Sequence, residues 1–152
     1  MNPCLLLLAL AATAPLPRPG ALKADQLVGE WVVQSLTKGG ETTEFPQSIG
    51  DRIIKRFTSD GALTWPDEHQ KDGGLGKQTY TLDTSADPAR IDVHVDLPSG
   101  TRKTYLGILT IDRDKLTLAI APDGSDRPTR FDSSKLDSTH VWIYKRLRRS
   151  KE

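Results

Sequence analysis

The chain has 152 residues, of which 36% are hydrophobic and 27% are charged, a composition that fits one soluble domain with a core of its own. With 21 Lys and Arg against 20 Asp and Glu, the net charge is only +1, and this balance argues against nucleic acid as a partner. The single cysteine, Cys4, lies near the N-terminus. A disulfide framework, a thiolate metal site and a cysteine nucleophile are therefore excluded from the rest of the chain.

Residues 1–24 have the composition of an export leader. Leu5 to Ala14 is apolar except for Thr13, about the length of a signal-peptide hydrophobic region and too short to span a bilayer. No basic residue precedes this run, and Pro15 follows the small residues of Ala12-Thr13-Ala14, so an unstructured apolar leader is the alternative. We expect the leader to be removed and the mature chain, without a transmembrane segment, to be periplasmic or extracellular.

The rest of the chain has the pattern of short β-strands. Residues 24–27 have room for one helical turn, and from Trp31 onward the apolar residues recur with a period of two, the period of a strand. The predicted strands, in chain order, are residues 31–36, 52–59, 62–65, 77–83, 90–97, 101–111, 115–121 and 139–147. This is about the number of strands in a small closed barrel.

Short turns join most of these strands. Asp60-Gly61 and Asp112-Arg113-Asp114 are typical hairpin turns, whereas residues 40–50, 67–76 and 122–137 are predicted to be long polar loops. No stretch of helical period is long enough for a βαβ unit. The sequence therefore predicts an all-β fold, a small antiparallel up-and-down β-barrel of about eight strands over residues 25–147, with a basic tail at 148–152.

Several segments together resemble a known family. They are Leu27-Val28-Gly29-Glu30-Trp31, Tyr80-Thr81-Leu82-Asp83, Tyr105-Leu106-Gly107-Ile108, Ala121-Pro122 with Gly124, and Arg127-Pro128-Thr129-Arg130-Phe131. The chain resembles, over about residues 25–147, an uncharacterised small lipocalin-like domain that is expanded in planctomycete bacteria. The resemblance implies a fold and no reaction. In lipocalins an Arg near the last strand stacks on the Trp of the Gly-x-Trp motif, which here implies Arg146 or Arg148 on Trp31.

The primary functional hypothesis is a non-enzymatic binding module, with no cofactor and no metal. It would hold a small apolar or amphipathic ligand in the barrel, or a protein partner on its loops. The alternative is a structural or protein-interaction domain with a filled core and no ligand, and cavity size separates the two. The residues predicted to point into the barrel are Trp31, Val33, Phe57, Trp65, Tyr80, Ile91, Leu106 and Trp142.

The loop at 122–137 carries the second candidate site. Arg127 and Arg130 lie among Asp123, Asp126 and Asp132, and their guanidinium groups could bind an anion or a partner at the barrel mouth. The favoured alternative is structural: these arginines pair with the neighbouring aspartates, and the apolar residues of the loop anchor it to the barrel.

Two sets of potential metal ligands have more ordinary explanations. Asp92, His94 and Asp96 share one face of a strand, which is expected to be solvated because Ile91, Val93 and Val95 occupy the inward face. Residues 67–69 lie in a Gly-rich loop of a kind that is usually exposed. The basic C-terminal residues could contact anionic lipid, but such ends are more often frayed and solvated.

Overall fold

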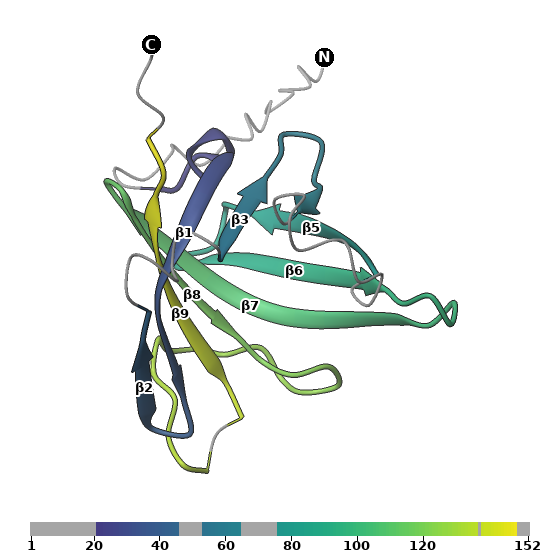
Figure 1. The fold of residues 1–152 in the computed structure, drawn as a ribbon, viewed down its shortest axis with the longest axis vertical. Coiled ribbons are helices and arrows are strands. Elements are labelled where there is room, and N and C mark those ends of the chain that lie inside the picture. Colours follow the sequence, from purple (N-terminus) through teal and green to yellow (C-terminus); the bar gives the residue numbers. More distant parts are fainter. Residues whose placement is uncertain (1–20, 46–52, 65–75, 137, 149–152) are drawn as a thin grey trace, which may run out of the picture.

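The computed structural model describes residues 21–45, 53–64, 76–136 and 138–148 (Figure 1). It contains one antiparallel sheet of nine strands and a short 3-10 helix. The elements are η1 (Ala24–Gln26), β1 (Gly29–Lys38), β2 (Glu41–Glu44), β3 (Ile54–Phe57), β4 (Leu63–Thr64), β5 (Lys77–Asp83), β6 (Ala89–Asp96), β7 (Arg102–Asp112), β8 (Lys115–Ile120) and β9 (His140–Arg146).

The strands form an up-and-down barrel that is nearly closed. The sheet order is β4-β3-β1-β9-β8-β7-β6-β5, so β5 to β9 follow one another as a meander and β9 returns to pair with β1. An isolated bridge between Ala62 and Thr79 brings β4 against β5, and the Tyr80 N–H donates to the Gly61 carbonyl at 2.8 Å. The predicted fold class, a lipocalin-like antiparallel barrel with eight strands in its path, is confirmed.

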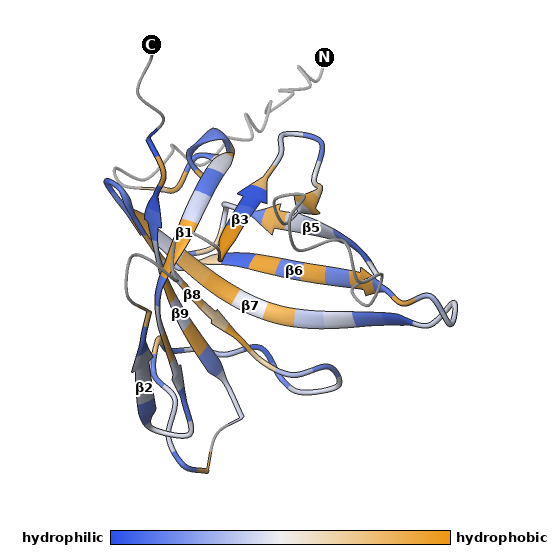
Figure 2. Cartoon of the chain, in the orientation of Figure 1, coloured by the Kyte–Doolittle hydropathy of each residue, from blue (hydrophilic) through white to orange (hydrophobic). Residues whose placement is uncertain are grey.

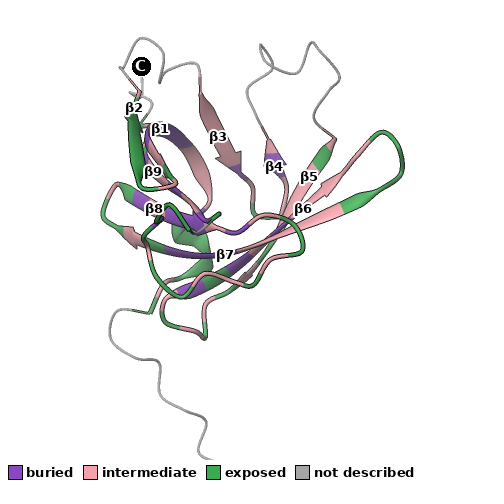
Figure 3. Cartoon of the chain, turned by 90° about the horizontal axis from the view of Figure 1, so that it is seen from below, coloured by how far each residue is buried: buried purple, intermediate pink, exposed green. Residues whose placement is uncertain are grey.

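Strand β2 lies where the sequence predicts a loop. It forms a hairpin with the end of β1, in which Lys38 pairs with Glu41. Gly39 and Gly40 have φ angles of +59° and +79°, as the favoured two-residue hairpin turn requires. All four β2 residues are exposed and appear green in Figure 3. Because neither face of this strand is buried, its sequence shows no apolar alternation.

A β-bulge interrupts the regular alternation of β1. Val33 pairs with Tyr144 of β9, and Ser35 pairs with the adjacent residue, Ile143. One extra residue on β1 is therefore accommodated between them, which bends the strand and ends the strict alternation predicted for residues 31–36. Strand β6 keeps the alternation, and Figure 2 shows it as successive polar and apolar bands along that strand.

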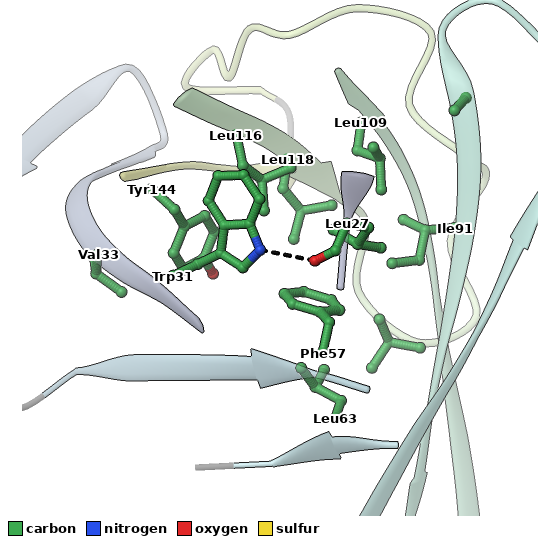
Figure 4. Packing of buried hydrophobic residues seen from close by; sticks show 12 residues of the cluster. Leu27, Trp31, Val33, Phe57, Leu63, Ile91, Leu109, Leu116, Leu118 and Tyr144 are labelled. Atoms are coloured by element: carbon green, nitrogen blue, oxygen red, sulfur yellow. Dashed lines mark hydrogen bonds between the residues drawn. The ribbon is translucent and has the colours of Figure 1, made fainter. Parts of the chain in front are cut away.

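The lumen is packed tightly at one end of the barrel. At this end β1 begins and β9 ends, and Leu27, which precedes β1, contributes to the packing. We call this region the closed half; its most deeply buried residues, each at most 3% exposed, are Leu27, Trp31, Phe57, Leu63, Ile91, Leu109, Leu116 and Leu118. Leu82 and Ile111, which lie opposite Ile91 and Leu116, are partly buried at the same end. Figure 4 shows the indole of Trp31 within this cluster.

At the opposite end the inward-facing apolar residues are only partly buried. These residues pack against the core on their inner side and keep part of their surface exposed. We call this region the open half and define it by Ile53, Val95, Tyr105, Ile120 and Trp142. The fully buried Val33 and Tyr144 lie between the two halves.

Candidate functional site

The residues predicted to line the barrel divide between its two halves. Trp31, Phe57 and Ile91 are at most 1% exposed and belong to the closed half, where they pack against one another. Val33 is fully buried at the boundary. Tyr80 and Trp142 face inward and are partly buried, while Trp65 lies outside the described residues. Of the predicted set, Trp142 in the open half and Tyr80 next to Phe57 remain partly exposed.

The prediction that Leu106 faces inward is wrong. Leu106 lies opposite Asp92 in the β6–β7 pairing, whereas Tyr105 and Gly107 lie opposite the inward residues Val93 and Ile91. Strand β7 has apolar residues on both faces because a loop covers its outer side: Ile108 packs there with the loop residue Phe131. In such a strand apolar character does not identify the inward face.

The Gly-x-Trp motif builds the end of the closed half. The Trp31 indole N–H donates to the Leu27 carbonyl at 2.8 Å, and the Arg146 guanidinium lies 4.2 Å from the indole centroid. Of the two arginines expected there, Arg146 makes this contact, while Arg148 pairs with Asp114. Gly29 has a φ of +134°, and a Cβ at this position would lie 2.9 Å from Arg146 Nη1. The positive φ is what favours glycine here, because L side chains rarely adopt that backbone conformation.

Lys55 points into the open half from β3, a position the sequence analysis did not single out. It alternates with Phe57 of the closed half and pairs with Trp31 across to β1, so its side chain shares their face. Its Nζ lies 5.8 Å from the ring centroid of Trp142, within the range of a cation–π contact. The signal in the sequence was the alternation of Lys55 with Phe57.

Burial in the barrel changes the acid–base properties of two groups. Desolvation lowers the pKa of Lys55 from 10.5 to about 8, since removing water penalises the charged ammonium. Burial also raises the pKa of Tyr144 far above its usual range. The Tyr144 hydroxyl has no hydrogen-bond partner among the described residues, although its ring stacks on Trp142 with centroids 6.1 Å apart. Such an orphaned hydroxyl is uncommon in a protein interior.

Along the described strands β3 to β9, the charged residues at inward register positions are basic. In the described part of β1 before its bulge and of β3 to β9, no carboxylate occupies an inward register position. Besides Lys55, Lys103 lies opposite Val95 and His140 lies opposite Ile120, both towards the open end. Burial and the nearby charge of Lys38 lower the pKa of His140. The carboxylates of β6 lie on the outer face, at Asp92 and Asp96.

Arg127 attaches the 122–137 loop to the outside of the barrel. Its guanidinium donates to the carbonyls of Ile91 at 3.0 Å and Gly107 at 2.7 Å and pairs with Asp92 at 2.6 Å. Its partner is thus a carboxylate on β6 rather than one of the neighbouring aspartates that the sequence suggested. This geometry matches the structural role favoured for Arg127, since the guanidinium is already engaged by the barrel.

An open pocket of about 290 Å3 lies beside this loop. The exposed Arg130 pairs with the neighbouring Asp132 at 3.4 Å. The two arginines of the lining are balanced by two aspartates, so the pocket has no excess of either charge. The lining residues are Ala121, Ser125, Asp126, Arg127, Pro128, Thr129, Arg130, Asp132, Ser138 and Thr139.

The outer face of β6 does not gather metal ligands. Asp92 pairs with Arg127, Asp96 pairs with Arg102 at 2.6 Å, and His94 Nδ1 lies 3.1 Å from the Thr104 hydroxyl. These three side chains therefore bind protein partners beside them. No cluster of three potential ligands occurs in the part of the chain that the structure describes, and residues 67–69 lie outside that part.

Comparison of the chain with known protein families, with curated proteins and with solved structures gives no match. Within the described ranges, none of the helical structure has the length and apolar character needed to cross a membrane.

Proposed function

We propose that this chain is an exported, non-enzymatic binding module that holds a small apolar or amphipathic molecule in the open half of its barrel. The observation that carries the proposal is the unequal packing of the lumen. Inward residues such as Val95, Tyr105 and Trp142 stay partly exposed, whereas most inward residues of the closed half are at most 3% exposed. Apolar walls with few inward polar groups are the usual lining of a small-molecule site.

Tight packing of the closed half also supports the second candidate, a structural domain without a ligand. Buried side chains such as Leu109 and Leu116 leave that half no space for a molecule. The two functions differ in one consequence: only a binding module takes up an apolar molecule in its open half.

Titration of the mature domain with decanol, an uncharged probe, separates these functions. Trp142 lines the open half, so we expect a saturable change in tryptophan fluorescence and a matching calorimetric isotherm. Val95→Trp places an indole in the open half and should weaken binding by roughly tenfold or more. His94→Trp places the same indole on the outer face of β6 and should leave binding unchanged. The absence of saturable binding to the wild-type domain would favour the structural domain.

Export is tested separately by expressing the full chain in a bacterial host with a secretion pathway. We expect the protein in the periplasm or medium, with an intact mass that corresponds to cleavage between residues 11 and 25. A full-length mass confined to the cytoplasm would contradict export and leave ligand binding unaffected.

A further inference from the structure

We propose that the molecule bound in the open half carries an uncharged oxygen acceptor, a carbonyl or a hydroxyl, at its inner end, and that this oxygen accepts a hydrogen bond from the Tyr144 hydroxyl. This inference rests on the proposed binding function and names the chemical class of its ligand.

The first support is the state of the Tyr144 hydroxyl. It is completely buried and has no hydrogen-bond partner among the described residues. Two other inward aromatic side chains are bonded within the protein. The Trp31 indole N–H donates to the Leu27 carbonyl at 2.8 Å, and the Tyr80 hydroxyl donates to the Thr58 carbonyl at 2.6 Å. A phenylalanine would fill the place of Tyr144 without the cost of an unpaired donor, so packing alone does not account for the tyrosine.

The second support is the apolar surroundings of this hydroxyl. Tyr144 lies opposite Val33 of β1 and Leu116 of β8, which are both fully buried, and Figure 4 shows its ring beside the indole of Trp31. A charged group would lose its hydration here at a high cost, whereas one uncharged oxygen loses less and gains a bond. Burial also raises the pKa of Tyr144 far above its usual range, so the phenol stays protonated and can donate.

The third support is the position of Trp142 next to Tyr144. Trp142 precedes Tyr144 by two residues on β9, so it shares the same face and lies nearer to the open end. The two rings stack with centroids 6.1 Å apart, and Trp142 keeps part of its surface exposed. A molecule that enters from the open end therefore meets this indole first. A sideways shift of the indole gives the inner end of the molecule access to the hydroxyl.

The test compares two probes of the same shape: methyl hexyl ketone, and its hydrocarbon analogue in which a methylene group replaces the carbonyl oxygen. We expect Tyr144→Phe to bind the ketone roughly fivefold to tenfold more weakly than the wild-type domain, as for the loss of one neutral hydrogen bond. The hydrocarbon should bind to both proteins with the same affinity. Tyr80→Phe removes a hydroxyl that is already bonded to the Thr58 carbonyl, and it should leave the ratio of the two affinities unchanged.

Two further measurements distinguish this role from a purely structural one. Without ligand, Tyr144→Phe should unfold at the same or a higher urea concentration than the wild-type domain, because no hydrogen bond to a described residue is lost. The carbonyl stretching band of the bound ketone should lie at a lower frequency in the wild-type domain than in Tyr144→Phe, because a hydrogen bond weakens the C=O bond. A lower urea midpoint for the variant would show that the hydroxyl is already bonded in the free domain and would overturn the inference.

The titrations separate this inference from the proposed function. An equal effect of Tyr144→Phe on both probes, or no effect on either, would overturn the inference and leave the binding function standing. A carbonyl band at the same frequency in the two proteins would do the same. Binding of neither probe to the wild-type domain would overturn both the inference and the binding function.

Discussion

The closed and open halves are built from the same strands, yet their inward side chains differ in how far they are buried. In the closed half Trp31, Phe57 and Leu116 are almost completely removed from water, and Arg146 covers the indole from outside. In the open half Trp142 and Tyr105 remain partly exposed, and a lysine is placed among them. Burial of apolar surface is the main source of folding free energy, so the closed half stabilises the fold. The open half is where we propose that a ligand binds.

The largest expected effect comes from truncating the matched tryptophans of the two halves. Trp31→Ala removes a fully buried indole and its hydrogen bond to Leu27, and should lower the free energy of unfolding by about 3–5 kcal/mol. Trp142→Ala should cost about 1–2 kcal/mol, because its surface is only partly buried. Urea unfolding of the mature domain measures both values. Equal losses would contradict the division into two halves.

The Lys55→Met substitution should raise the free energy of unfolding, whereas the two tryptophan substitutions lower it. At pH 7 the ammonium is charged in both the folded and the unfolded chain, and the lowered pKa of Lys55 means that burial penalises this charge. Removing it should therefore raise the free energy of unfolding by about 1–3 kcal/mol.

The stability gain of Lys55→Met should depend on pH. In the wild-type domain the lysine loses its proton near pH 8 when folded and near its usual pKa of about 10.4 when unfolded. Between these values the unfolded chain binds more protons, so wild-type stability rises with pH. The stability gain of Lys55→Met should thus be largest at pH 7 and shrink as the pH passes 8. A gain that does not change with pH would contradict the burial of the ammonium.

The smallest expected effect lies outside both halves, at the loop. Arg127→Met removes the bonds to β6 and β7 and should cost about 1–2 kcal/mol. Arg130→Met breaks only an exposed ion pair and should change stability by less than about 0.5 kcal/mol. Thermal unfolding compares the two, and decanol binding should be unchanged in both. Equal effects would mean that the Arg127 contacts do not hold the loop.

The closed half could be predicted well from the sequence, and the physical reason is alternation. Trp31, Phe57 and Ile91 lie on strands in which large apolar residues recur every second position, and all three are buried in the structure. Alternation was misleading for Leu106, since β7 is covered on both faces. Alternation could not predict β2, because the residues of this strand are buried on neither face.

The open half and the loop contacts were harder to predict because they depend on residues far apart in sequence. The pairing of Arg127 with Asp92 spans 35 positions, and nothing local distinguishes Asp92 from the aspartates nearest to the arginine. Lys55 shared the predicted face of Phe57, but a charged residue is ordinarily expected on the solvated side. Its inward position became informative only with β9 in place and Trp142 beside it.

The most direct test of the binding function is native mass spectrometry of the mature domain, purified gently from the host that exports it. The account predicts a reproducible added mass that is lost on denaturation and that fragments as a small apolar or amphipathic molecule. A bare mass for the wild-type domain, together with no response to decanol, would contradict the account and leave a filled structural barrel.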